Sequence, residues 1–596
     1  MASVLEKRER KKFLDDTIPL IPTITTHRME VAGKQSHAAY VVRVQRGQNP
    51  EDSWEVSHRY NNFYALYQTL QVSNIPLDIP SKKMFGNTDR QFLNDRQQGL
   101  QKFLDQVMAA PVLRRHFEVK KFLDPTNYSL SFHEDALRNA SMFFRSEPTW
   151  SVVEPLKDIG WRIRKQYYVI ASKTDHRLPK HMLSWCEPGP DSSLGEKEME
   201  ACFRVMTDLR HPYILSPVLA NYTGGGMMIV RELMPSGSLR DTIYGQRFQG
   251  SVLQKYGQPA RSRALSLPDI AKYGRQVLEA LVFLSEKGFP LGQVHAGNVL
   301  LDRGTCKLVD IENSLVGVPS LHRHHLIDIR RIHSHEAETV YSFGHMLYEM
   351  CMGQELKTAT LDSVPESLPA GVVPILQRVL TSNGIKDNFP SLSNLLDDVF
   401  FSTVSLPPTG GKPLMKVSSK LKEVLKEHIS KMELRLHEEQ KKVSQLKRLS
   451  KAQESLMSEE EKRKRRKLRK KQLSLQETSE PESYPTTKAL PRQNTIGTSG
   501  VTASTAVRSK ANSAPPPASQ SSSTQPAAST TSSTAKTKKS SATPKAPPPP
   551  TATPPAPQVD RPPPTEKRGA LLGSIEGFTK GKLKKVKTKD RSAPKV

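Results

Sequence analysis

The fold of the largest domain is decided by residues 281–310, LVFLSEKGFPLGQVHAGNVLLDRGTCKLVD. The end of an apolar helix is followed by a loop with one Asn, a Val-Leu-Leu strand and a second strand that ends in Asp. This order brings Asn298 and Asp310 close together, and amide and carboxylate oxygens are ligands that suit Mg²⁺. Taken alone, an Asn and an Asp at this spacing are more typical of a plain turn, so the flanking sequence has to decide.

The flanking sequence predicts two lobes with a cleft between them. Strand-like runs at 167–170 and 227–230 surround one helix in the first half, with a hairpin turn at Gly224-Gly225-Gly226. The second half is mainly helical, with strong periodicity at 270–287 and 341–352.

Three further segments give this region a specific resemblance. They are HPYI at 211–214, ELMPSGSL at 232–239 and VYSFGHMLYEM at 340–350. Together with the opening stretch, and in this order, they resemble the protein kinase fold over about residues 152–402.

The catalytic loop departs from the kinase pattern. Aligned on Asn298, residues 291–298 (LGQVHAGN) replace H-R-D-L-K-P-E-N, so Gln293 occupies the place of the catalytic Asp. A carboxamide cannot accept the proton of the substrate hydroxyl, and a positioned general base contributes about 10²–10⁴-fold. His295 stands where the loop lysine belongs. It is either an ordinary loop histidine or, in an unconventional Ser/Thr kinase, a substitute base.

The nucleotide-binding elements are also altered. Compared with the family, Trp185 stands at the place of the phosphate-binding Lys, Cys202 at that of its partner Glu, and the glycine-rich loop keeps only Gly160. The metal-binding Asp survives as Asp310. The sequence therefore predicts a pseudokinase without catalytic residues and without a required cofactor, and binding of ATP and Mg²⁺ through Asn298 and Asp310 stays open.

The N-terminal region forms a separate small domain. Strands are predicted at 38–44 and 53–58, and helices at 61–71 and 90–108, with a proline-flanked loop between the helices. Its basic and aromatic residues can build a pocket, because a guanidinium grips a phosphate bidentately, a ring covers an apolar sugar face and a lysine supplies a point charge. Scattered solvated cations are the competing interpretation. The candidate residues are Arg59, Tyr60, Lys82, Lys83 and Arg96.

Order and spacing favour the pocket. The segments HRYNNF (58–63), IPSKKMFGN (79–87) and DRQQGL (95–100) together resemble the phox-homology (PX) domain over about residues 15–125. That resemblance implies a preference for phosphatidylinositol 3-phosphate. It assigns the 3-phosphate to Arg59, ring stacking to Tyr60, the 1-phosphate to Lys82 or Lys83, and the 4- and 5-hydroxyls to Arg96.

The C-terminal third has a different composition. The chain of 596 residues has a formal net charge of +28, and 24 of these surplus charges lie in residues 411–596. We expect residues 411–473 to form a charged helix. Residues 474–565 are expected to form a disordered Ser/Thr/Pro-rich linker. The basic run at 462–471 is typical of a solvated helix face, an anionic-membrane contact or a nucleic-acid patch. Nucleic acid is not expected, because the last 116 residues hold only two aromatic side chains to stack on bases.

A short motif near the end predicts a partner. Residues 571–578 place apolar side chains on one helical face, and an extended basic element follows. This pattern resembles the WASP-homology-2 actin-binding motif over 566–588, and the polyproline tracts upstream fit profilin or an SH3 domain. The resemblance implies actin contacts by Leu571, Leu572, Ile575, Leu583, Lys584, Lys585 and Val586.

The cysteine content and the hydropathy of the sequence limit where in the cell the protein is expected. Four cysteines without a CxxC pair argue against a disulfide scaffold, and there is neither a signal peptide nor an apolar run of 18 residues. We expect a cytoplasmic protein that contacts membranes peripherally.

The combination of domains resembles the PX domain-containing protein kinase-like family. The expected class is α+β multidomain, with a PX domain at 15–125, a linker at 126–151 and a kinase-like domain at 152–402 before the charged helix and tail. The resemblance implies a scaffold for receptor trafficking on endosomal and plasma membranes, with sodium-pump β-subunits as partners. The alternatives are an active Ser/Thr kinase that uses His295 or substrate assistance, and, more weakly, a nucleic-acid-binding protein.

Overall fold

The computed structural model describes residues 13–32, 35–82, 89–129, 131–175, 177–223, 225–257, 262–387, 389–407 and 411–476. All of them belong to one compact unit within residues 1–483. Sheets and helices alternate as groups along the chain, which confirms the α+β multidomain class. Lys83, Gly224, nearly all of the predicted Ser/Thr/Pro-rich linker at 474–565 and the actin motif lie outside the described residues.

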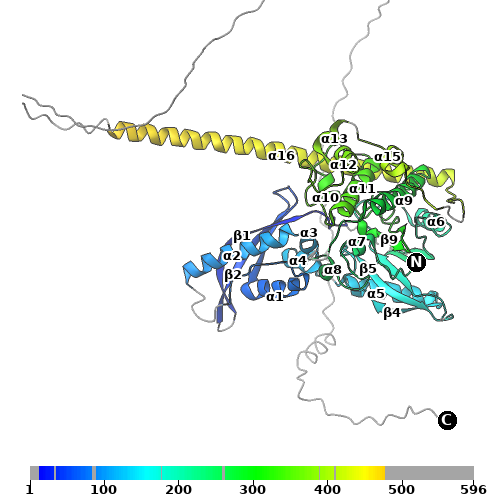
Figure 1. Cartoon of the computed structure of the whole chain (residues 1–596). Coiled ribbons are helices and arrows are strands. Elements are labelled where there is room, and N and C mark those ends of the chain that lie inside the picture. The colour runs from blue at the N-terminus through cyan, green and yellow to red at the C-terminus, as the bar shows by residue number, and fades with distance from the viewer. Residues whose placement is uncertain are drawn as a thin grey trace, which may run out of the picture. The chain divides into compact units, whose positions relative to one another are not determined.

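The N-terminal domain is a three-stranded antiparallel sheet covered by helices (Figure 1). Its central strand pairs Val42 with Ile24 on one side and with Val56 on the other. Phe63, Leu100 and Phe103 close the core against the sheet. The elements are β1 Leu20–Ala32, β2 Gln35–Arg46, β3 Ser53–Arg59, α1 Tyr60–Leu70, a 3₁₀ turn at Gln71–Ser73, α2 Arg90–Ala109, α3 Pro111–Arg114 and α4 Phe117–Leu123.

The next sheet has five strands in the order β4-β5-β6-β8-β7. Helix α6 packs against one face, and α5, within the segment predicted as a linker, packs against the other through Ala136 and Ala140. Helix α5 therefore belongs to the core of this lobe. The elements are α5 Phe132–Ser146, β4 Trp150–Pro155, β5 Lys165–Ser172, β6 His181–Cys186, α6 Glu196–Thr207, β7 Leu219–Thr223 and β8 Gly226–Glu232.

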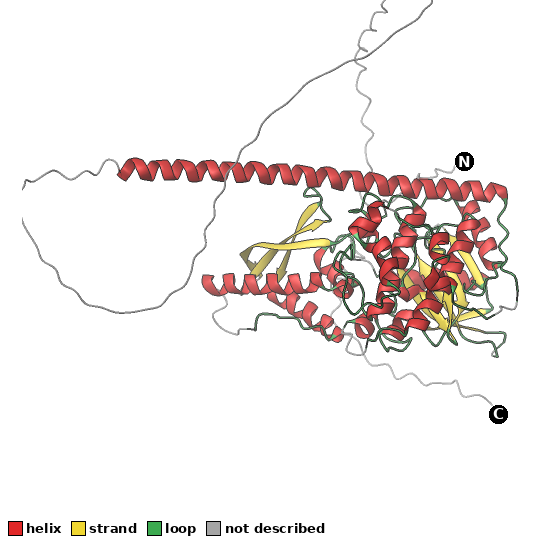
Figure 2. Cartoon of the chain, turned by 45° about the horizontal axis from the view of Figure 1, so that its top comes forward, coloured by secondary structure: helices red, strands yellow, loops and turns green. Residues whose placement is uncertain are grey.

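The following lobe is mainly helical (Figure 2). Helix α11 is buried on nearly every side, and a two-stranded sheet, β9-β10, follows the predicted catalytic loop. The elements are α7 Leu239–Ile243, α8 Val252–Tyr256, α9 Leu267–Glu286, a 3₁₀ turn at Ala296–Asn298, β9 Val299–Asp302, β10 Thr305–Leu308, α10 Arg323–Leu326, α11 His335–Met352, α12 Val373–Leu380, α13 Ser382–Asp387, α14 Leu392–Leu396 and α15 Val399–Ser402.

The charged helix α16, Ser419–Gln476, begins later than the predicted segment and is anchored by its first half. Leu425 and Leu436 are buried in the core of the helical lobe. Arg435 pairs with Asp191 at 2.5 Å, and the amide of Gln440 donates to three backbone carbonyls of the 326–332 segment. The helix then continues past the lobe, as Figures 1 and 2 show. No helix in the described part of the chain is both long and apolar enough to cross a membrane.

The two predicted domains share side chains at their junction. Leu253 of α8, in the kinase-like domain, is buried in the core of the N-terminal domain. Gly257 is in close contact with Ser73, whose carbonyl oxygen would lie 2.3 Å from a Cβ at that position. Arg115 pairs with Glu355 at 3.0 Å across the same junction. Experiments on either domain therefore need the full chain.

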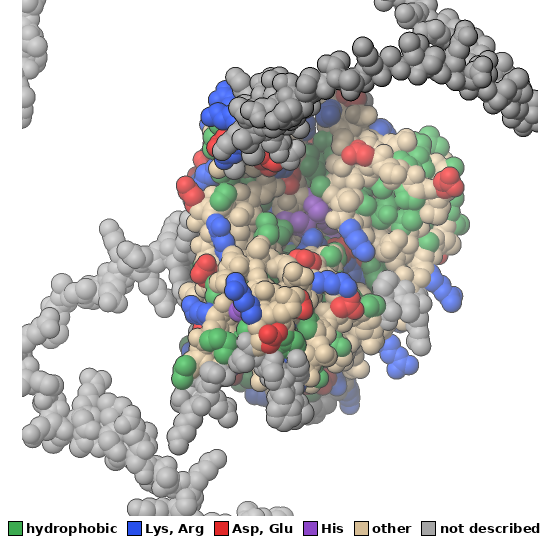
Figure 3. All heavy atoms as spheres, turned by 90° about the vertical axis from the view of Figure 1, so that its left-hand side faces the viewer, with side chains coloured by type: hydrophobic (Ala, Val, Ile, Leu, Met, Phe, Trp, Pro, Cys, Tyr) green, Lys and Arg blue, Asp and Glu red, His purple; other side chains and the backbone are tan. Residues whose placement is uncertain are grey.

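Four histidines cluster near this junction, with His322 and His345 buried and His324 and His325 half-buried. The rings of His322 and His345 lie 4.2 Å apart, and those of His324 and His325 3.9 Å apart. The guanidinium of Arg114 lies 3.2 Å from His324. Burial lowers the pKa of His325 to about 4 and that of His345 to about 3, so both rings are neutral at pH 7. Histidine side chains are visible in a recess of the face shown in Figure 3.

We expect this cluster to make the fold sensitive to acid. The unfolded histidines titrate near pH 6.5, at about their ordinary pKa, so below that pH the unfolded chain binds more protons than the folded one. Stability is then lost as pH falls from about 6.5 toward the folded pKa values, by about 1.4 kcal/mol per pH unit for each histidine. Urea unfolding of the full chain at pH 7 and pH 5 measures this loss.

The matched variants are His345→Phe and His333→Phe, because His333 is exposed. The first should lose part of the pH dependence and the second none of it. An identical pH dependence in both variants and the wild type would contradict the assignment.

Candidate functional site

Arg96 lies at the centre of the predicted lipid pocket. It is 7% exposed, and its guanidinium carbon lies 4.4 Å from the ring centre of Tyr60 and 4.2 Å from that of Phe92. Its Nη2 donates to the backbone oxygen of Ser81 at 3.3 Å. No carboxylate of the described residues forms an ion pair with it. A buried cation between two rings and without an acidic partner is suited to an anionic or polyhydroxyl ligand.

The proline loop is held against this cation by Tyr60. The Tyr60 hydroxyl donates to the carbonyl of Pro80 at 2.6 Å, and burial raises the pKa of this phenol, so it stays protonated. Gly99 allows the loop to approach α2, because a Cβ there would lie 2.5 Å from Pro80 Cγ. The loop therefore brings Ser81, the residue before Lys82, into contact with Arg96.

Arg59 and Lys82, two further residues of the predicted pocket, are neighbours in sequence of residues that contact Arg96 or the proline loop. Arg59 ends β3 directly before Tyr60, and its backbone N–H donates to the side chain of Asn62 at 2.9 Å. The side chains of Arg59 and Lys82 are exposed and form no ion pair with a described residue. The structure thus brings Tyr60 and Arg96 into contact, with Arg59 next to Tyr60 in the chain and Lys82 next to Ser81, while Lys83 is not among the described residues.

The prediction that Trp185 occupies the place of the phosphate-binding lysine is wrong by one residue along the strand. Trp185 and Leu183 lie on the face of the sheet opposite the cleft, where they are buried against Tyr168 and helix α5. Ser184 and Cys186 face the cleft, since successive residues of a strand point to opposite faces. Cys186, rather than Trp185, therefore stands where the family places its phosphate-binding lysine.

A lysine that sequence reasoning missed reaches the same place from the neighbouring strand. Lys165 of β5 pairs in register with Cys186 and is fully buried. Its Nζ lies 2.8 Å from Asp310, 3.5 Å from Glu312 and 2.9 Å from the amide oxygen of Asn313. Burial alone would lower the pKa of Lys165, but the carboxylates outweigh it and raise that pKa. The sequence did contain a clue to this residue. Lys165 lies at a strand position whose side chain points to the same face as the buried residues of the cleft.

A second buried ion pair extends this network. Arg231 of β8 binds both carboxylate oxygens of Glu312, at 3.0 and 2.6 Å. Helix α6 adds no acid to the cleft, because Cys202 is buried among apolar side chains and Glu200 points to solvent. Two cations and two anions from the strands and the 310–312 segment therefore neutralise one another inside the cleft.

Residues of the altered glycine loop cover the position at which kinases have the catalytic base. Gln293 accepts a hydrogen bond from Arg162 at 2.5 Å and donates to the carbonyl of Val318 at 2.9 Å. The indole N–H of Trp161 donates to Nε2 of His295 at 3.3 Å. Burial, followed by the nearby arginines, lowers the pKa of His295 well below its usual value. In this arrangement His295 is 7% exposed and already bonded.

The residues considered for Mg²⁺ and nucleotide both have partners within the protein. Asn298 uses its amide within its own loop: its Oδ1 accepts from the His295 backbone at 3.0 Å, and its Nδ2 donates to the carbonyl of Gln293. Asp310 is paired with Lys165. Within the described ranges no group of three or more His, Cys, Asp or Glu side chains could hold a metal ion.

Three family models match the chain. They are the PX domain at residues 47–126, the protein tyrosine and serine/threonine kinase at 189–314 and the WH2 motif at 564–593. The first indicates phosphoinositide binding and the third actin binding. The actin-contact residues predicted above fall within the third match.

Several known proteins are similar to this chain over part of its length. A PX domain-containing protein kinase-like protein from Rattus norvegicus is 42% identical over 453 residues, which is 76% of this chain and 77% of that protein. The Slowpoke-binding protein of Drosophila melanogaster is 33% identical over 35% of this chain and 42% of its own length. The probable inactive serine/threonine-protein kinase slob1 of Dictyostelium discoideum is 29% identical over 46% of this chain and 51% of its own.

Proposed function

Because the chain belongs to the PX domain-containing protein kinase-like family, we propose that it is a peripheral-membrane adaptor that binds phosphatidylinositol 3-phosphate and actin. The observation that carries the lipid assignment is the buried Arg96 between two rings, one of them Tyr60, which directly follows the exposed Arg59. Arg96 would hold ring hydroxyls, Arg59 the 3-phosphate and Lys82 the 1-phosphate. Lys83 is the alternative for this last role.

The kinase-like domain serves as an interaction module and transfers no phosphate. Gln293 cannot act as a base, and Arg162 and Trp161 lie over the catalytic loop. The alternative of an active kinase would use His295 or substrate assistance, and His295 is buried and bonded to Trp161. The names of the Dictyostelium relatives, probable inactive kinases, support the same conclusion.

The client of this module is a membrane protein. The name of the Drosophila relative states that it binds Slowpoke, and we extend that kind of partner to this chain. Receptor trafficking on endosomal and plasma membranes and an interaction with sodium-pump β-subunits remain proposals by family resemblance. Binding of profilin or SH3 proteins to the polyproline tracts is likewise a proposal.

Lipid binding by the full chain tests the first part of this proposal. Arg59→Ala should weaken binding to vesicles with phosphatidylinositol 3-phosphate by about 10–100-fold, because a charged hydrogen-bonded phosphate contact contributes about 1.5–3 kcal/mol. Vesicle co-sedimentation across a series of phosphoinositides and phosphatidylserine measures the affinity and the preference.

The matched control is Arg43→Ala, an exposed arginine on the adjacent strand. It should leave the affinity unchanged, and neutralising the 462–471 run should weaken binding to all anionic vesicles alike. If Arg59→Ala reduced binding to phosphatidylserine and to the phosphoinositide equally, the pocket assignment would be wrong.

A further inference from the structure

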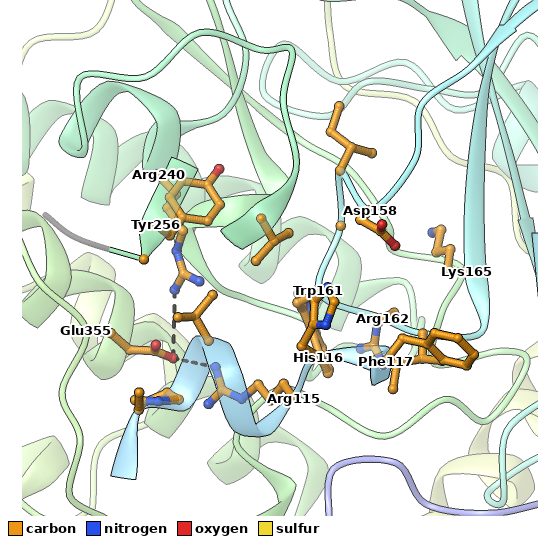
Figure 4. A pocket seen from close by; sticks show the side chains of 18 of the residues that line it. Arg115, His116, Phe117, Asp158, Trp161, Arg162, Lys165, Arg240, Tyr256 and Glu355 are labelled. Carbon is orange, nitrogen blue, oxygen red and sulfur yellow. Dashed lines mark hydrogen bonds and ion pairs between the residues drawn. The ribbon is translucent and has the colours of Figure 1, made fainter. Parts of the chain in front are cut away.

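A cavity of about 390 Å³ lies where the PX domain meets the front of the kinase-like cleft (Figure 4). Its volume is within the range of small-molecule sites, roughly 300–1,000 Å³. Phe117 of α4, Tyr256 of α8 and Trp161 of the segment between β4 and β5 contribute aromatic walls. No residue of the 232–239 hinge segment lines it, so it is distinct from the position at which kinases hold an adenine ring.

Arg162 is the unusual residue of this cavity. It is 9% exposed, its guanidinium carbon lies 4.2 Å from the Trp161 ring centre, and the one hydrogen-bond partner of that guanidinium among the described residues is the neutral amide of Gln293. No described carboxylate lies within ion-pair distance. A buried guanidinium without an anion is costly, because its lost hydration is not replaced.

The neighbouring cations differ from Arg162 because each of them forms an ion pair with a carboxylate. Arg240 pairs with Glu349 at 2.7 Å, and Lys165 pairs with Asp310 at 2.8 Å. Glu355, which lines the cavity, lies between Arg115 at 3.0 Å and Arg240 at 4.0 Å, as the dashed lines in Figure 4 mark. The carboxylates that serve these cations are therefore not available to Arg162.

We propose that this cavity binds a small amphipathic anion, with an apolar body between the aromatic walls and one carboxylate, sulfonate or phosphate on Arg162. Such a group would take over the hydrogen bond that Gln293 now accepts and would supply the missing negative charge. The ligand would be enclosed by both domains, since Phe117 belongs to the PX domain and Trp161 to the kinase-like domain. This site does not depend on the proposed lipid and actin functions.

The probe for this site is 8-anilinonaphthalene-1-sulfonate, an aromatic sulfonate whose fluorescence rises on binding. We expect saturable binding at one high-affinity site on the full chain. Arg162→Met should weaken it at least tenfold, and Arg162→Lys, which keeps the charge, should weaken it less than about threefold. Arg204→Met, at a highly exposed arginine, should leave it unchanged.

Energy transfer from tryptophan locates the bound probe. Trp161→Phe should reduce tryptophan-sensitised emission of the probe while circular dichroism stays unchanged. Displacement by adenosine monophosphate would identify a phosphate-bearing ligand, and displacement by laurate a carboxylate with an alkyl body. Binding that is non-saturable, or equally strong in wild type and Arg162→Met, would overturn the proposal.

Discussion

Replacing Lys165 with Met is expected to lower the free energy of unfolding by about 3–5 kcal/mol, the usual cost of removing one partner from a buried ion pair. The change leaves Asp310 without its cation, while Glu312 keeps only Arg231. Methionine fills a similar volume, so little of the loss would come from a cavity. Urea unfolding of the full chain measures it.

A double-mutant cycle separates the charge effect from packing. Lys165→Met combined with Asp310→Asn should be clearly more stable than the sum of the two single changes predicts, because the uncompensated charge is removed. Lys173→Met, just beyond the end of β5 and exposed, is the matched control and should cost less than about 0.5 kcal/mol. Additive single changes, or a loss below 1 kcal/mol for Lys165→Met, would show that the network does not hold the cleft together.

Replacing Leu571, Leu572 and Ile575 together with Ala should weaken binding of monomeric actin by the full chain at least about 100-fold. Each of these side chains would bury an apolar surface worth about 1.5–3 kcal/mol in the cleft of actin. Fluorescence of labelled actin monomer measures the affinity. The change should leave lipid binding intact.

The control for this prediction is a pair of apolar truncations in the linker, Val501→Ala and Val507→Ala, which should have no effect. If the triple variant bound actin as well as the wild type, only the attraction of the basic residues for an acidic surface would remain. The WH2 assignment of function would then fail.

Periodicity predicted the helices well because their faces differ strongly in polarity. Helices were expected at 90–108 and 270–287, and they lie at Arg90–Ala109 and Leu267–Glu286. Strand β1 was missed, since Pro22 and several polar residues interrupt its alternation over Leu20–Ala32.

Strand register explains the error in the cleft. The β6 strand is buried on both faces, so its hydrophobicity does not reveal which residues face the cleft, and a slip of one residue exchanged Trp185 for Cys186. Lys165 was overlooked because the family places its lysine on the next strand. The burial of Leu253 in the PX core depends on contacts between segments far apart in sequence, and no local pattern reports them.

The measurement that tests the adaptor proposal most directly is vesicle flotation of the full chain with labelled monomeric actin. The account predicts that vesicles with phosphatidylinositol 3-phosphate carry actin upward only when the protein is present. This recruitment should be lost in both Arg59→Ala and the triple Leu571, Leu572 and Ile575 variant, and should be the same with and without ATP. Flotation of actin that requires ATP, or that survives both sets of substitutions, would contradict the account.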